Sequence, residues 1–176
     1  MSTITAEQST QQSVNLTPDQ QKFISRIINP LTFRFFLLFK LPLGLLSGMR
    51  VQYLDKSKCV TTVPYRWITR NPFKSTYFAA LSMAAELSNG AMALLAVYNI
   101  KPSVAVIIVG METEFVKMAK DVTTFTCEDG DKLFAAVDET IKTGESVTAQ
   151  LTTIGRAEDG TEVARFKFTW SYKRRG

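Results

Sequence analysis

Histidine is absent from the 176-residue sequence. This absence excludes every mechanism with a histidine base, including the Ser-His-Asp and Cys-His arrangements. It also removes the commonest zinc ligand, and we expect no metal site. Any acid–base chemistry must therefore fall to carboxylates, lysine, tyrosine or cysteine.

Cysteine is almost absent as well, since Cys59 and Cys127 are the only two. Their spacing matches no metal or redox motif, and one pair is not a disulfide framework. Both lie in apolar or strand-like surroundings, so we expect reduced core thiols. Residues 1–12 lack the basic and apolar regions of a secretory signal. Together these features favour a cytoplasmic location.

The excess of positive over negative charge is small, and long apolar runs are also scarce. The formal net charge of +5 suits an anionic ligand, an acidic partner or simple solubility. No basic stripe interleaved with aromatic residues is present, so we expect no nucleic-acid partner. The apolar segment 31–46 contains Arg34, Lys40 and Pro42 and falls short of the roughly 20 apolar residues of a membrane span. We expect no stable membrane insertion, and a peripheral membrane contact stays open as an alternative.

The chain is long enough for one domain with one core. We expect a flexible tail over residues 1–16 and a single domain over 17–176 with an N-terminal helical extension, 17–46. Thr17 and Pro18 are typical of a helix start. A second helix should follow Pro30 and run to about Lys40, and Pro42 should help to end it.

The rest of the pattern predicts an α+β fold in which one long helix is wrapped by an antiparallel sheet. Residues 51–63 should form a hairpin, and 75–98 a helix that begins at Ser75 and is apolar nearly all round, hence buried. The apolar run 104–109 should be a strand buried on both faces. Further strands are expected at 121–127, 147–152 and 165–172, and an amphipathic helix at 131–143, with Gly144 at its end.

Polar residues within the long helix could carry chemistry. Glu86 is the only charged residue between Lys74 and Lys101. Ser82, Glu86 and Asn89 share one helix face, because they are four and then three residues apart. A partly buried glutamate has a raised pKa and suits a general base, although the three residues could instead form the solvent face. We expect a pocket between this face and the loop 66–74.

The stretch 71–90 resembles the hotdog-fold thioesterase superfamily, most closely an uncharacterised branch related to phenylacetyl-CoA-type thioesterases. The motif of that family is Asn-x-x-Gly-x-x-His-Gly-Gly, followed by an acidic residue in the central helix. This chain has Asn71 at the first position, Lys74 for the glycine, Tyr77 for the histidine, Phe78 and Ala79 for the two glycines, and Glu86 at the acidic position.

The resemblance implies an acyl-CoA thioesterase whose catalytic residues are Glu86, as general base or nucleophile, and Asn71. Coenzyme A would enter as part of the substrate, with no separate cofactor. The protein would act as a homodimer or homotetramer with the site between protomers. The substrate, a small acyl thioester, would be bound by Tyr77, Phe78, Ala79, Ser82, Asn89, Lys74, Phe73 and Trp67.

A second reading is a non-catalytic hotdog protein that binds acyl-CoA or a fatty acyl chain. The loss of the family histidine and of Gly-Gly favours it. Simpler structural roles also stay open for individual residues. Asn71 precedes a proline and suits a turn, Tyr77 suits packing, and Trp67 and Phe73 suit the core.

Overall fold

A computed structural model describes residues 16–176. The tail predicted for residues 1–16 lies outside these residues apart from Leu16. The helices are α1 (Pro18–Ile28), α2 (Pro30–Lys40), α3 (Pro42–Ser47), α4 (Phe78–Val97) and α5 (Gly130–Thr143). The strands are β1 (Arg50–Leu54), β2 (Cys59–Val63), β3 (Val104–Phe115), β4 (Thr123–Cys127), β5 (Val147–Arg156) and β6 (Glu162–Arg174).

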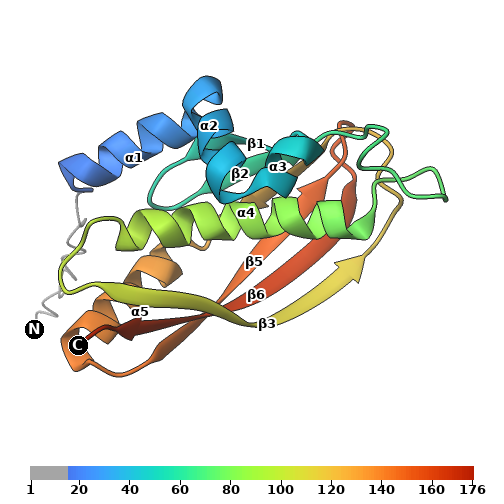
Figure 1. Ribbon diagram of the computed structural model, residues 1–176. Helices are drawn as coiled ribbons and strands as arrows, with labels where there is room; N and C mark the ends of the chain where they lie inside the picture. Colours follow the sequence, from blue (N-terminus) through green and yellow to red (C-terminus); the bar gives the residue numbers. More distant parts are fainter. Residues whose placement is uncertain (1–15) are drawn as a thin grey trace, which may run out of the picture.

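The six strands form one antiparallel sheet in the order β1-β2-β4-β5-β6-β3. The sheet curves around α4, while α1, α2 and α3 gather near the β1 end (Figure 1). The predicted α+β arrangement, a long helix wrapped by an antiparallel sheet, is confirmed.

The core lies between α4 and the concave face of the sheet. On β6 the alternation is clean, since Phe166, Phe168, Trp170 and Tyr172 are all buried. By length and composition α4 could cross a membrane, but 67% of its apolar stretch is buried inside the protein. It is therefore the core helix of this fold.

The two cysteines lie directly opposite each other on β2 and β4. Both are free and buried, as the sequence predicted. Burial raises the pKa of the Cys127 thiol to about 11 and raises the pKa of the Cys59 thiol further. Neither thiol is therefore a reactive nucleophile at neutral pH.

One predicted helix boundary is wrong. The long helix begins at Phe78 rather than after Ser75, because the backbone N–H and hydroxyl of Ser75 are hydrogen-bonded to Asn71 in the preceding loop. The second helix ends at Lys40, as predicted, and Pro42 starts the short helix α3 as its first residue, a position that needs no backbone N–H. Gly48, with φ +74°, then ends α3 in the left-handed conformation.

The apolar run 104–109 forms the start of β3, but the prediction that both of its faces are buried is wrong. β3 pairs only with β6 and is an edge of the sheet. Ile107 is 63% exposed and Val109 is 58% exposed, while Val104 is buried. One face of β3 therefore packs inward. The apolar side chains on its other face, and its unpaired edge, are not covered by any part of residues 16–176.

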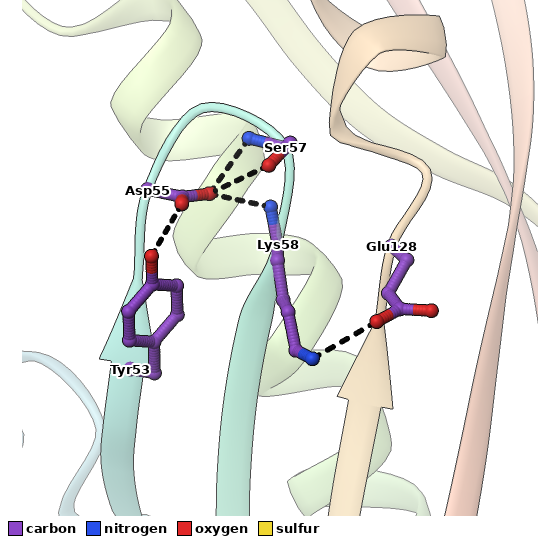
Figure 2. Close-up of polar contacts among 5 residues, drawn as sticks. All are labelled: Tyr53, Asp55, Ser57, Lys58 and Glu128. Atoms are coloured by element: carbon purple, nitrogen blue, oxygen red, sulfur yellow. Dashed lines mark hydrogen bonds and ion pairs between the residues drawn. The ribbon is translucent and has the colours of Figure 1, made fainter.

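The turn between β1 and β2 is organised by Asp55 (Figure 2). Its carboxylate accepts hydrogen bonds from the hydroxyl of Tyr53, the backbone N–H groups of Ser57 and Lys58, and the hydroxyl of Ser57. Partial burial pushes the pKa of Asp55 upward, but these hydrogen bonds outweigh it and hold the pKa below its usual value. The backbone N–H of Gly130, which begins α5, donates to the carbonyl of Ser57 at 3.0 Å. This turn thus anchors α5 and has a structural role.

Candidate functional site

Glu86 lies midway along α4 at the mouth of an apolar pocket of about 280 Å³. The pocket is walled by α2 on one side and by the sheet on the other. Its lining includes Phe36 and Lys40 from α2, Leu41 directly after α2, Leu87, Gly90, Ala91, Ala93 and Leu94 from α4, Val106 from β3 and Trp170 from β6. The helix α2 therefore forms part of the site, a role that the sequence pattern did not indicate.

The carboxylate of Glu86 rests over Gly90, one turn further along α4. A Cβ atom at Gly90 would lie 2.6 Å from Glu86 Oε1, so only glycine leaves the carboxylate this space. Within residues 16–176 the carboxylate has no hydrogen-bond donor and no ion pair, although Lys40 lines the same pocket. Burial raises the pKa of Glu86, which is the electrostatic setting of a general base.

A second, larger pocket of about 540 Å³ lies over the N-terminus of α4. It is lined by the loop that precedes α4, by Tyr77, Phe78 and Leu81 of the first turn, and by Phe115–Ala119 at the end of β3. Tyr77 and Phe78 are 46% and 55% exposed, and their rings meet edge to face at 4.8 Å. Phe73 lines the same pocket and is 77% exposed rather than part of the core.

Asn71 lines this second pocket, but its side chain is engaged within its own loop. Its Oδ1 accepts hydrogen bonds from the backbone N–H of Phe73 at 2.9 Å and of Ser75 at 3.2 Å. Its Nδ2 donates to the hydroxyl of Ser75 at 3.0 Å. The turn-forming interpretation of Asn71 is therefore correct for the single chain, and only the second N–H of its Nδ2 is left to polarise a carbonyl.

The first backbone amides of α4 remain available. Tyr77 is the N-cap, and its side chain makes no capping hydrogen bond. Within residues 16–176 the N–H groups of Phe78 and Ala79 have no acceptor, since the first amides of a helix lack intrahelical partners. They point out of a helix N-terminus, where developing negative charge is stabilised.

The predicted polar stripe on α4 does not form one site. Asn89 is fully buried and faces the sheet, where its Nδ2 donates to Thr153, and the thiol of Cys127 lies 3.8 Å from its Oδ1. The hydroxyl of Ser82 donates to the carbonyl of Phe78 at 2.9 Å and lines neither pocket. Helical spacing placed these residues within one broad sector, but the concave sheet covers the Asn89 side of that sector.

Two other predicted binding residues also lie away from both pockets. Trp67 is 78% exposed and lines neither of them. Lys74 also lines neither, but its backbone is informative. It has φ +59°, the left-handed conformation that glycine adopts without strain, at the position where the resembled motif has glycine.

The pocket predicted between the Glu86 face of α4 and the loop 66–74 is not present as a single cavity. In one chain the Glu86 pocket and the Asn71 pocket share no lining residue. Both nevertheless touch β3, at Val106 for the first and at Phe115 for the second. The two halves of the candidate site therefore lie toward opposite ends of the same edge strand.

The chain belongs to the family described as "Domain of unknown function (DUF4442)". The model of that family matches residues 31–172, which include α2 and α3 as well as the sheet and α4. The residues of α2 that wall the Glu86 pocket are thus part of the family domain. No curated protein matches the chain.

Solved structures with the same fold are numerous. A protein of unknown function from Pseudomonas aeruginosa, described as a probable thioesterase, is 20% identical over 85% of this chain and 99% of its own, with a TM-score of 0.70. A protein of unknown function from Chlorobaculum tepidum is 14% identical, with coverages of 91% and 98% and a TM-score of 0.70. A thioesterase from Haemophilus influenzae is 12% identical, with coverages of 83% and 91% and a TM-score of 0.61. The fold is therefore the hotdog fold of thioesterases.

Proposed function

We propose that this protein hydrolyses the thioester of an acyl-CoA, with Glu86 as the general base. The observation that carries the proposal is the setting of Glu86. Its carboxylate has a raised pKa, has no ion-pair partner in residues 16–176 and lies over Gly90 at the mouth of an apolar pocket. The thioesterase descriptions of two similar structures agree with this chemistry.

In this mechanism Glu86 accepts a proton from water as the water oxygen attacks the thioester carbonyl. The oxyanion that forms is stabilised by the free N–H groups of Phe78 and Ala79. Collapse of the tetrahedral intermediate breaks the carbon–sulfur bond, and the departing thiolate takes the proton back from Glu86. Attack by the Glu86 carboxylate itself, through an anhydride that water then hydrolyses, is the variant that the same geometry allows.

The Glu86 carboxylate and the α4 amides must meet at one substrate, and a second copy of the chain supplies this arrangement. Antiparallel pairing of β3 with β3 of a second copy, centred near Gly110, would bring the Val106 end of one strand beside the Phe115 end of the other. Glu86 of one protomer would then lie near the α4 N-terminus of its partner. Pairing would also cover the exposed edge and Ile107 and Val109.

Oligomeric state tests this arrangement directly. Ile107→Lys places a charge on the proposed β3 interface and should convert the dimer into monomer in sedimentation experiments at micromolar concentration. Leu43→Lys is the matched control, because Leu43 is also 63% exposed but lies on α3. If wild-type protein is monomeric, the shared site is wrong.

The catalytic role is tested by Glu86→Gln, which keeps the size of the side chain but cannot accept the proton. With acyl-CoA substrates of several chain lengths, kcat should fall by about 10²-fold or more while KM changes little. Glu139→Gln on the exposed face of α5 is the control for loss of one carboxylate. The wild-type rate should rise with pH through the raised pKa of Glu86. Equal activity of wild type and Glu86→Gln would end the assignment.

The alternative function, acyl-CoA or fatty-acyl binding without hydrolysis, is favoured by one observation. The side-chain Oδ1 of Asn71 and one N–H of its Nδ2 are hydrogen-bonded within its own loop. Under this alternative, wild-type protein and Glu86→Gln would both be inactive on a broad thioester panel, yet both would bind a non-hydrolysable acyl-CoA ether tightly.

A further inference from the structure

A third hollow, which we name the arginine cleft, lies between α2, α3 and the start of β1. Its volume is about 380 Å³, within the usual range for small-molecule sites. Arg34, Arg50, Arg66 and Gln52 line it together with the apolar residues Ile28, Pro30, Phe33, Leu37, Leu45, Met49 and Val51. It shares no lining residue with the two pockets described above.

Three elements that are far apart in the sequence bring these arginines together. Arg34 comes from α2, Arg50 begins β1, and Arg66 follows β2. The guanidinium of Arg66 packs on Gly48 at the end of α3, where a Cβ atom would lie 3.2 Å from Arg66 Nη1. This glycine has φ +74°, so the close approach and the left-handed turn require the same residue.

The charge of the cleft is uncompensated. No acidic side chain lines it. Within residues 16–176 none of the three guanidinium groups forms an ion pair within 4.0 Å. Exposed arginines scattered singly are simply solvated, whereas three that line one cavity without an acidic neighbour create a positive potential that favours an anion.

The arginine cleft also has an apolar lining. Phe33, Leu37, Met49 and Val51 are each at most 5% exposed, so they form a fixed apolar floor below the arginines. A planar guanidinium binds phosphate or carboxylate through two parallel hydrogen bonds. A free inorganic anion would contact the arginines alone, whereas an alkyl chain would also contact the apolar side chains that line the cleft.

We propose that the arginine cleft binds an anionic amphiphile, with its phosphate or carboxylate head on Arg34, Arg50 and Arg66 and its alkyl chain along the apolar floor. Such a molecule exists both dispersed in water and as a component of a bilayer. The outer faces of α2 and α3 bear on this point, because they expose Leu31, Phe35, Leu38, Phe39, Leu43 and Leu46. Those side chains would contact a bilayer from which the amphiphile was taken.

Titration calorimetry with dodecyl phosphate tests the site on the full chain. Binding should weaken about tenfold for each of Arg34→Gln, Arg50→Gln and Arg66→Gln, since each removes a charge-assisted contact. Arg26→Gln, an equal change of charge on the exposed face of α1, should leave binding unchanged. Inorganic phosphate and dodecanol, which each carry half of the recognised chemistry, should both bind at least tenfold more weakly than dodecyl phosphate.

Flotation with phosphatidylcholine vesicles, with and without phosphatidic acid, shows whether the amphiphile is taken from a bilayer or from dispersion in water. Capture that requires phosphatidic acid, and is lost in both the Arg66→Gln and the Phe39→Ser variants, supports the site with a bilayer as the source. Binding of dodecyl phosphate without vesicle capture supports the site with a dispersed amphiphile as the source. Equal dodecyl phosphate affinity in wild type and all three arginine variants would overturn the proposal, as would inorganic phosphate binding as tightly as dodecyl phosphate.

Discussion

The contact between Glu86 and Gly90 allows the carboxylate to be moved without replacing it. Gly90→Ala adds one methyl group in the middle of α4. The three atoms nearest to that methyl group all belong to Glu86, and the closest, Oε1, would lie at 2.6 Å. A carbon and an oxygen cannot approach so closely, so the carboxylate must rotate away. Because the carboxylate is the end of a flexible side chain, the helix itself can stay in place.

The effects on stability and on activity should therefore separate. Replacing a mid-helix glycine by alanine stabilises a protein by roughly 0.5–1 kcal/mol. Forcing the Glu86 side chain away from its preferred rotamer costs about 0.5–1.5 kcal/mol. The two terms nearly cancel, so Tm should move by no more than about 2–4 °C in either direction. Loss of the positioned base should lower kcat by about 10²-fold, close to the effect of Glu86→Gln.

Calorimetric unfolding and steady-state hydrolysis on the same protein preparations measure both effects. The double variant Gly90→Ala/Glu86→Gln should be no less active than Gly90→Ala alone, because the base has already been displaced. Full activity in Gly90→Ala would refute the argument that the position of Glu86 over Gly90 matters. A large drop in Tm would show instead that the helix, rather than the side chain, had to move.

Three further predictions concern stability. Lys74→Gly should stabilise the protein by about 1 kcal/mol in urea unfolding, because glycine adopts the left-handed backbone at φ +59° without strain. Asn99→Gly, at φ +52°, should stabilise the protein less, because asparagine tolerates this conformation. Equal stabilisation by the two variants would contradict the strain argument. Asp55→Ala should cost about 1–2 kcal/mol at neutral pH, and Asp55→Asn less. Because the folded pKa of Asp55 is lowered, this stabilisation is complete above the unfolded value of 3.8 and is lost as pH falls through the folded pKa. If Asp55→Ala destabilises the protein equally below the folded pKa, the assigned role of the carboxylate is wrong. Glu86→Gln should stabilise by about 1 kcal/mol at neutral pH, because a raised pKa makes the ionised carboxylate unfavourable above 4.5, and below that pH thermal unfolding should show no gain.

The elements with a strong periodic signal were predictable. The alternation on β6, the amphipathic pattern of α5 and the apolarity of α4 each reflect a burial pattern that the structure repeats. The same reasoning failed for the apolar run that starts β3, which was predicted to be buried on both faces. An edge strand and a central strand can have the same amino-acid composition. Which strand lies at the edge depends on the pairing order, and no local pattern in the chain encodes that order.

The candidate site was only partly predictable for a related reason. Glu86 could be found because a single carboxylate stands out in an apolar helix. The wall formed by Phe36 and Lys40 of α2 and by Leu41, which follows α2, could not be found, because nothing in that segment indicates which part of α4 it will cover. Gly90 carried a usable signal, since a glycine one turn after a lone buried acid leaves room for the carboxylate on the same face.

The substituted motif positions also affect the two halves of the site unequally. Where the resembled motif has glycine, this chain accepts Lys74 at positive φ, so the turn before α4 keeps its geometry at some cost in strain. Where the motif has Gly-Gly, Phe78 and Ala79 keep their free backbone N–H groups, and Phe78 adds a side chain that lines the pocket. The parts of the motif that act through the backbone are therefore preserved, whereas the part that acted through a histidine side chain is lost. In the proposed mechanism such a site would stabilise an oxyanion without any histidine, and it would depend on Glu86 for every proton that must be moved.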